Sequence, residues 1–390
     1  MPDTTYKPGQ HFLQIPGPSN VPDRVLRAMA QPVVDHRGPD FPELTNRVMT
    51  KLAAVFKTAS PVIIYPASGT GGWESALLNT LSPGDKVLAF ETGHFATLWK
   101  NVAVKLGLDV DFVPGDWRHG IDVNTVREKL EADKEGSIKA VLAVHTETST
   151  GINSKIRDIR EAIDAAGHQA LFMVDAVSSL ACSDYRHDEW KVDVTVSASQ
   201  KGLMLPPGLC FNAISEKAIE ASANSRALHS YWRWEEMLTN NARGYFPYTP
   251  GTNLLYGLDE ALTMMDEEGL ENVLARHARL AQATRVAVDA WGLENLCLND
   301  DEYSNSTTAV LMPEGHDADA LRLAILDKFN MSLGMGLGKV KGKVFRIGHI
   351  GDFNDLMLAG TLSGVEMGLD IAGVPFRKGG VQAALEFLAK

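Results

Sequence analysis

The feature that most constrains the fold of this chain is the alternation, between residues 62 and 214, of short apolar segments with helical segments. The apolar segments are rich in β-branched residues and have little internal polar alternation, which is typical of strands buried on both faces of a parallel sheet. They are Val62–Tyr65, Lys86–Phe90, Val110–Val113, Ala140–His145, Leu171–Asp175, Val192–Ser197 and Leu209–Ile214. The pattern predicts an α/β fold whose mostly parallel seven-stranded sheet lies between helices.

The remainder of the chain predicts a second, smaller domain. At 390 residues the chain exceeds the size at which a single hydrophobic core keeps growing. After Ile214 the pattern becomes polar and aromatic, and a long helical region begins near Leu254; beyond it, helices mix with short strands at Thr307–Met312 and Lys343–Ile347. We expect a large domain at residues 21–258 and a small C-terminal α+β domain at residues 259–390.

Composition excludes several classes of partner. The net charge is −12 and no block of lysines and arginines opposes it, so neither nucleic acid nor an anionic membrane surface is expected as a partner. No apolar run approaches the roughly 20 residues that span a bilayer, and the first ten residues lack an apolar signal region, so we expect a cytoplasmic protein. Cys182, Cys210 and Cys297 have none of the spacings of a zinc site or disulfide framework, and no metal is expected.

Three polar features follow predicted strands. A glycine-rich turn at Ser68-Gly-Thr-Gly-Gly opens a helix and would offer backbone N–H groups to a phosphate, although it is equally consistent with a tight turn. Asp175 ends an apolar strand, where a buried carboxylate needs a cationic or proton-donating partner; taken alone, a helix cap or local salt bridge is more common. Lys201 lies on a loop of small and apolar residues, where desolvation favours a neutral, nucleophilic amine, whereas most lysines are solvated.

The positions of these three features in the predicted sheet favour a functional role over the structural alternatives. All three features lie at the carboxyl ends of predicted parallel strands, where ligands bind in such sheets. Arg346 interrupts a further strand, and its guanidinium suits bidentate binding of a carboxylate, with an interdomain salt bridge as the alternative. Phe95 and His145 also follow strands, but a single aromatic or His residue is more often packing than catalysis.

Six motifs occur in a fixed order along nearly the whole chain. They are Pro16-Gly-Pro-Ser-Asn, Ser68-Gly-Thr-Gly-Gly-Trp-Glu, Glu147-Thr-Ser-Thr-Gly, Val174-Asp-Ala-Val-Ser-Ser, Ser199-Gln-Lys-Gly and Arg346-Ile-Gly-His-Ile-Gly. As an ordered set they resemble the class V, fold type I aminotransferases that use pyridoxal 5'-phosphate, in the branch of serine glyoxylate and alanine glyoxylate aminotransferases.

The resemblance implies a role for each matching residue. Lys201 would bind the cofactor aldehyde as a Schiff base and carry the proton during catalysis, and Asp175 would keep the pyridine nitrogen protonated. Arg346, Pro16 and Gly17 would bind the substrate, with Arg346 at its carboxylate. The remaining residues would surround the cofactor: Ser68, Gly69, Thr70 and Gln200 at the phosphate, and Phe95 and Thr148 at the ring.

The resemblance also implies a homodimer with shared active sites. Residues 1–20 would form an N-terminal segment that reaches the partner subunit. Thr249 would serve the neighbouring subunit's phosphate site, together with either Tyr245 or Tyr248.

Three positions depart from some relatives. Phe95 stands where some have Trp, Thr70 where some have His, and Pro16 replaces a Gly. The first two retain a flat apolar ring and a phosphate donor, whereas the third lies near the family's substrate pocket and leaves the choice of amino donor open.

The expected reaction is a two-stage transamination in which a small amino acid gives its amino group to glyoxylate, forming glycine. L-Serine, which would give hydroxypyruvate, is the first choice of donor, and aspartate or alanine is the alternative. A cysteine desulfurase-like lyase would need a cysteine on a mobile loop, and Cys297 lies instead in an apolar run. A non-catalytic relative would not need Lys201, Asp175 and Arg346 together.

Overall fold

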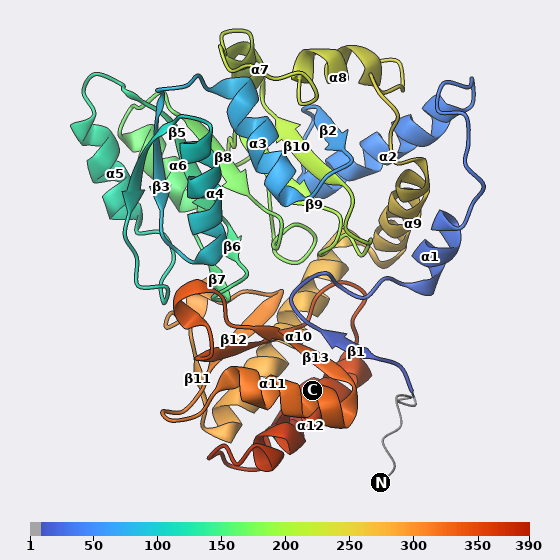
Figure 1. The fold of residues 1–390 in the computed structure, drawn as a ribbon, viewed down its shortest axis with the longest axis vertical. Coiled ribbons are helices and arrows are strands. Elements are labelled where there is room, and N and C mark those ends of the chain that lie inside the picture. Colours follow the sequence, from blue (N-terminus) through green and yellow to red (C-terminus); the bar gives the residue numbers. More distant parts are fainter. Residues whose placement is uncertain (1–8) are drawn as a thin grey trace.

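The computed structural model describes residues 9–390, so the first eight residues of the predicted N-terminal segment lie outside the described residues. The chain forms two lobes, each built around its own sheet (Figure 1). We call them the large lobe and the small lobe. None of the helices in this part of the chain combines the length and apolarity needed to cross a membrane.

The large lobe contains a seven-stranded sheet in the order β2-β10-β9-β8-β5-β3-β4. β10 runs antiparallel to β2 and β9, and the other neighbouring strands are parallel, which confirms the predicted fold class. The strands are β2 (Val62–Tyr65), β3 (Lys86–Phe90), β4 (Asp109–Val113), β5 (Ile138–Val144), β8 (Leu171–Asp175), β9 (Val194–Ala198) and β10 (Cys210–Ile214).

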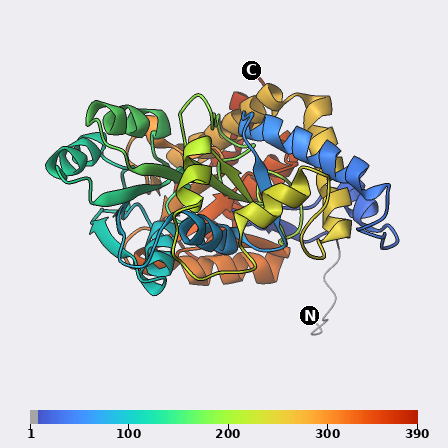
Figure 2. The ribbon, with the colours of Figure 1, turned by 90° about the horizontal axis from the view of Figure 1, so that it is seen from above.

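Helices cover both faces of this sheet (Figure 2). They are α1 (Asp23–Met29), α2 (Phe41–Phe56), α3 (Gly69–Thr80), α4 (His94–Lys105), α5 (Val123–Ala132), α6 (Ile156–Ala165), α7 (Glu216–Ser222), α8 (Trp234–Asn241) and α9 (Thr252–Glu268). A short hairpin of β6 (Thr146–Glu147) and β7 (Ile152–Asn153) follows β5. Because both faces are covered, most strand residues are buried, as the unbroken apolar runs predict.

The small lobe contains a five-stranded sheet in the order β1-β13-β14-β12-β11. Its elements are β1 (Phe12–Gln14), α10 (Leu270–Trp291), β11 (Glu294–Asn295), β12 (Thr307–Leu311), α11 (Ala318–Phe329), β13 (Met331–Met335), β14 (Val344–Gly348), α12 (Asp355–Ile371) and α13 (Gly380–Leu388). The N-terminal strand β1 pairs with β13, so the start of the described chain belongs to the small-lobe sheet before it passes to the large lobe.

The predicted boundary at residue 258 falls inside helix α9. Leu255, Leu258 and Leu262 of this helix are buried in the core of the large lobe, and α9 packs against α1 and α2. The following helix, α10, begins in that core with Val273 and enters the core of the small lobe from Leu280 onward. The cores of the two lobes are therefore separate, whereas the division at residue 258 stays a prediction.

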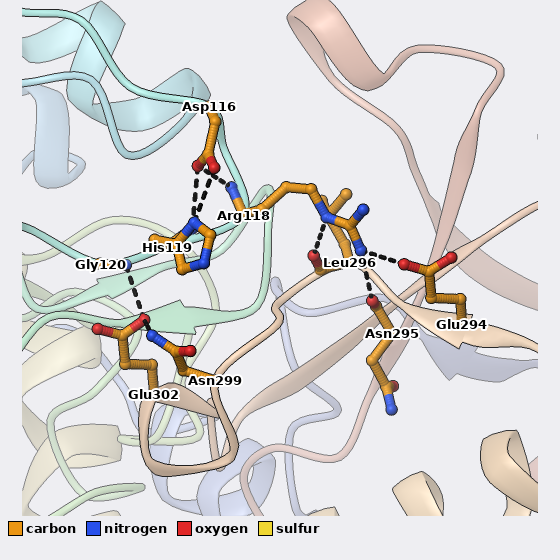
Figure 3. A network of polar contacts seen from close by, with 9 residues as sticks. All are labelled: Asp116, Arg118, His119, Gly120, Glu294, Asn295, Leu296, Asn299 and Glu302. Carbon is orange, nitrogen blue, oxygen red and sulfur yellow. Dashed lines mark hydrogen bonds and ion pairs between the residues drawn. The ribbon is translucent and has the colours of Figure 1, made fainter.

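Polar contacts join the loop after β4 to the small lobe (Figure 3). Arg118 donates from Nε to the carbonyl oxygen of Leu296 at 2.9 Å and forms an ion pair with Glu294. The backbone N–H of Gly120 donates to Glu302 at 2.9 Å. Each charged group in this contact, which we call the interlobe network, has a partner.

Candidate active site

A pocket of about 240 Å³ lies at the carboxyl ends of the large-lobe strands. It is lined by most of the residues that the sequence predicts for the site, namely Gly17, Ser68, Gly69, Thr70, Phe95, Thr148, Asp175, Gln200 and Lys201. These residues come from six separate segments of the chain, and most of them meet because parallel strands end at one edge of the sheet.

Asp175 is the last residue of β8, and its carboxylate is buried in the wall of this pocket. Oδ1 accepts a hydrogen bond from the Val177 backbone at 2.7 Å, and Oδ2 accepts one from the Trp73 indole at 3.0 Å. It forms no ion pair with any described residue. Burial raises the pKa of Asp175 to about 7, against the lowering effect of the two hydrogen bonds.

Lys201 follows β9 and is also buried. Its Nζ donates to the carbonyl oxygen of Pro16, and a Cβ on Gly17 would lie only 2.5 Å from its Cδ, so only glycine fits where the N-terminal segment crosses this side chain. Burial, followed by the charge of Arg346, lowers the pKa of Lys201 to about 7. A large fraction of the amine is therefore neutral, and thus nucleophilic, at neutral pH.

The glycine-rich turn leads from β2 into α3, as predicted. Ser68 precedes the first turn of the helix, and its side chain makes no capping hydrogen bond. A Cβ on Gly69 would lie 2.8 Å from the Val177 side chain, which explains glycine at this position. The first N–H groups of the helix have no intrahelical acceptor, so with the hydroxyls of Ser68 and Thr70 they offer donors to an anion.

Arg346 lies in β14 of the small lobe and is buried beside the pocket without lining it. Nε donates to the Met335 carbonyl oxygen at 2.8 Å, and Nη1 donates to that of Thr148 at 2.9 Å. Among the described residues, no carboxylate forms an ion pair with it. Burial lowers the pKa of Arg346 to about 10, so the guanidinium stays charged at neutral pH.

Besides Arg346, four predicted residues lie outside the pocket wall. Pro16 contributes through its carbonyl oxygen, which accepts from Lys201. Thr249 is exposed, with its hydroxyl 3.5 Å from His36. Tyr245 donates to the Gly38 carbonyl oxygen at 3.4 Å, and Tyr248 stacks on a neighbouring tyrosine. The shared-site roles of Thr249 and the tyrosines stay predictions.

Sequence reasoning did not single out Trp73, Thr146, Val177 or Ser178, which also line the pocket. Ser178 shares a hydrogen bond with the hydroxyl of Thr148. Trp73 and Ser178 both lie within motifs noted in the sequence, one helical turn after the glycine-rich turn and three residues after Asp175. Their positions within these motifs were the signal from which a role in the pocket could have been predicted.

The cysteines of the chain do not take part in the pocket. Cys182, Cys210 and Cys297 are all buried, and burial raises the pKa of each thiol. None lines the pocket, so none offers the accessible thiolate that a desulfurase requires.

Comparison with known proteins identifies the family. The model of the class V aminotransferases matches residues 11–337. The serine–glyoxylate aminotransferase of Methylorubrum extorquens is 49% identical over 98% of this chain and 97% of its own length. The L-aspartate–glyoxylate aminotransferase of Paracoccus denitrificans is 44% identical over 97% of this chain and 96% of its own length.

A solved structure supports the same assignment. The ureidoglycine–glyoxylate aminotransferase of Bacillus subtilis superposes on this chain with a TM-score of 0.90 and is 28% identical to it in sequence. The superposition covers 99% of this chain and 100% of that protein. The protein described above belongs to the class V aminotransferases and is an aminotransferase.

The cofactor of this enzyme class is pyridoxal 5'-phosphate, and the pocket fits it. Asp175 is a buried carboxylate that has no cationic partner within residues 9–390, and a protonated pyridine nitrogen would supply one. Lys201 is a buried amine of lowered pKa, and the start of α3 offers donors suited to a phosphate. When bound, the cofactor accepts the amino group and withdraws the electrons of the broken bond at the substrate α-carbon.

Proposed function

We propose that the protein transfers the amino group of L-serine to glyoxylate, giving hydroxypyruvate and glycine. The observation that carries the proposal is a set of three buried ionisable groups, Asp175, Lys201 and Arg346, that form no ion pair with any residue from 9 to 390. Buried unpaired charges are costly, and a cofactor and a substrate carboxylate would supply the missing partners. The names of the similar enzymes give glyoxylate as the common substrate.

Each of these groups has one task in the proposed reaction. Arg346 binds the substrate carboxylate, leaving Lys201 Nζ to remove the proton from the α-carbon and return it later. Asp175 keeps a proton on the pyridine nitrogen. Around them, Ser68, Gly69, Thr70 and Gln200 bind the phosphate, and Phe95 and Thr148 contact the ring.

The pocket supports serine ahead of aspartate as donor. Lys201 is the one cation among the described residues that line it. With Arg346 occupied by the α-carboxylate and Lys201 needed for proton transfer, the described pocket residues offer no further cation for the side-chain carboxylate of aspartate. Serine brings only a hydroxyl, which Thr148 or Ser178 can hydrogen-bond.

A donor screen tests the proposal. Serine, alanine and aspartate are compared at saturating glyoxylate, with glycine formed as the readout and kcat/KM as the measure. We expect serine to give the largest kcat/KM. A larger value for aspartate or alanine would replace the proposed donor, and no glycine from any donor would reject glyoxylate as acceptor.

We also propose a cytoplasmic homodimer with shared active sites. Thr249 supports this arrangement, because it is exposed and does not line the pocket of its own chain. Co-expression of Lys201→Ala with Thr249→Ala tests it, since only mixed dimers would contain one active site free of both substitutions. Activity above that of either variant alone is expected, and a monomeric mass in solution would reject the dimer.

A further inference from the structure

Trp73 makes a contact that the roles above do not use. It lies at the start of the second turn of α3, is 3% exposed and lines the pocket. Its indole Nε1 donates a hydrogen bond to Oδ2 of Asp175 at 3.0 Å. On its other side, the indole stacks on Trp99 of α4 with ring centroids 5.9 Å apart and an interplanar angle of 13°. The direction of its N–H bond is therefore set by packing.

We propose that Trp73 is a positioning residue that holds Oδ2 of Asp175, so that the carboxylate stays ionised and correctly oriented toward the pyridine nitrogen of the cofactor. The inference rests on the proposed role of Asp175.

The two hydrogen bonds to Asp175 fix both of its oxygens. The Val177 backbone holds Oδ1, and Trp73 is the one donor to Oδ2 among the described residues. A carboxylate held at a single oxygen can rotate about its last side-chain bond, whereas two donors on different elements define its plane. Both bonds also favour the ionised form, which opposes the effect of burial on the pKa of Asp175.

The chain supplies a matched control in Trp99. Its indole belongs to the same stacked pair and is 1% exposed, but its buried Nε1 has no hydrogen-bond partner among the residues that the structure describes. Trp73→Phe and Trp99→Phe thus remove the same group from the same stack. Only the first removes a hydrogen bond to a charged side chain.

The first measurement is the dissociation constant of pyridoxal 5'-phosphate from each protein after the cofactor has been removed. A hydrogen bond to a charged group changes an equilibrium constant by roughly ten- to hundredfold, so we expect Trp73→Phe to weaken binding by at least about tenfold. Trp99→Phe should remain within about threefold of the natural protein. Equal effects of the two substitutions would overturn the proposal.

The separate effects on kcat and KM should distinguish a positioning role of Trp73 from a general disruption of the pocket. Because Trp73 acts through Asp175 on the ring, Trp73→Phe should lower kcat while leaving the KM for serine within about threefold. A raised KM at constant kcat would place Trp73 at the substrate instead.

A double-substitution cycle isolates the hydrogen bond. When Asp175 is already replaced by Asn, adding Trp73→Phe should weaken cofactor binding by less than about threefold. A further tenfold loss would mean that Trp73 acts by ring packing. If Asp175→Asn alone had no effect, the proposed role of Asp175 would fail, which is a separate result.

Circular dichroism shows whether each variant is folded. If Trp73→Phe is not, the pair Trp73→His and Trp73→Leu replaces it, because His keeps a ring N–H and Leu has none. His should then bind the cofactor at least about tenfold more tightly than Leu, and equal affinities would overturn the proposal.

Discussion

The pocket region and the interlobe network both contain charged side chains, but they differ in whether those side chains are buried and whether they form ion pairs. Asp175 and Lys201 in the pocket wall and Arg346 beside it are buried and form no ion pairs with described residues. In the interlobe network, Arg118 is 29% exposed at its side chain and has an ion-pair partner in Glu294.

The difference shows that the functional pocket, unlike the interlobe network, lowers the stability of the fold. Burying a charge without a partner costs free energy, and the pKa values of Asp175 and Lys201 near 7 reflect that cost. An exposed ion pair contributes only about 0–1 kcal/mol and costs little. Substitutions in the pocket should therefore change activity strongly, and substitutions in the network should change it weakly.

The largest expected effect is that of Lys201→Ala. Removing the amine that carries the proton should abolish transamination while leaving the protein folded, and borohydride reduction of the natural protein should attach the cofactor to Lys201. Peptide mapping and the glycine assay test both points. Lys129→Ala, which removes a surface lysine paired with Asp111, is the control and should retain activity. Reduced cofactor on another lysine would contradict the assignment.

The next effect is that of Asp175→Asn, which should lower turnover by several orders of magnitude and weaken cofactor binding. Loss of the charge-assisted hydrogen bond to the pyridine nitrogen accounts for roughly 1.5–3 kcal/mol before any electronic effect on the ring. Single-turnover kinetics with serine measure it. Turnover near that of the natural protein would remove Asp175 from the mechanism.

Arg346→Lys should raise the KM for both serine and glyoxylate, because both substrates carry a carboxylate next to the reacting carbon. Unpairing a desolvated charge costs roughly 2–5 kcal/mol, and lysine lacks the planar fork. Stopped-flow absorbance follows each half-reaction, and cofactor absorbance should be unchanged. Arg118→Lys is the matched control. If only one half-reaction weakens, Arg346 is a structural residue.

A smaller effect concerns stability and pH in the cofactor-free protein. The pKa of Lys201 falls from 10.5 to about 7 on folding, so its contribution to stability is complete above pH 10.5 and is lost as the pH falls through 7. Lys201→Met should therefore be more stable than the natural protein at pH 7, by up to a few kcal/mol, since one pKa unit is about 1.4 kcal/mol.

This advantage of Lys201→Met should shrink between pH 7 and pH 10.5. Both proteins keep Asp175, so the difference in their free energies of unfolding reports Lys201 together with its electrostatic effect on Asp175. Urea unfolding across that range measures it, and a difference independent of pH would contradict the lowered pKa.

The smallest effect should be that of Arg118→Ala in the interlobe network. Loss of the ion pair with Glu294 and the hydrogen bond to Leu296 should reduce the free energy of unfolding by about 1 kcal/mol. Thermal unfolding with and without 0.5 M salt checks this, since salt screens exposed pairs. A loss of activity comparable to that of Arg346→Lys would contradict the expectation that the interlobe network affects activity less than the pocket does.

Much of the large lobe follows from local sequence. β2, β3 and β8 have the bounds that their apolar runs predict, at Val62–Tyr65, Lys86–Phe90 and Leu171–Asp175. Hydrophobic periodicity is a local property, and the carboxyl ends of parallel strands share one edge, so the convergence of Asp175 and Lys201 was predictable. The sheet of the small lobe was harder to predict from the sequence. Its strands β1 and β13 are short segments that become strands only by pairing, β1 with β13 and β13 with β14.

The sequence by itself determined the fold class, the family and most of the residues that line the pocket. The tertiary structure alone decided how those residues are held. Trp73 and Asp175 are 102 positions apart, and Lys201 and Pro16 are 185 apart. No periodicity or motif records such a contact, because it depends on how separately folded elements pack, and it is this packing that places the donors and sets the pKa values of the site.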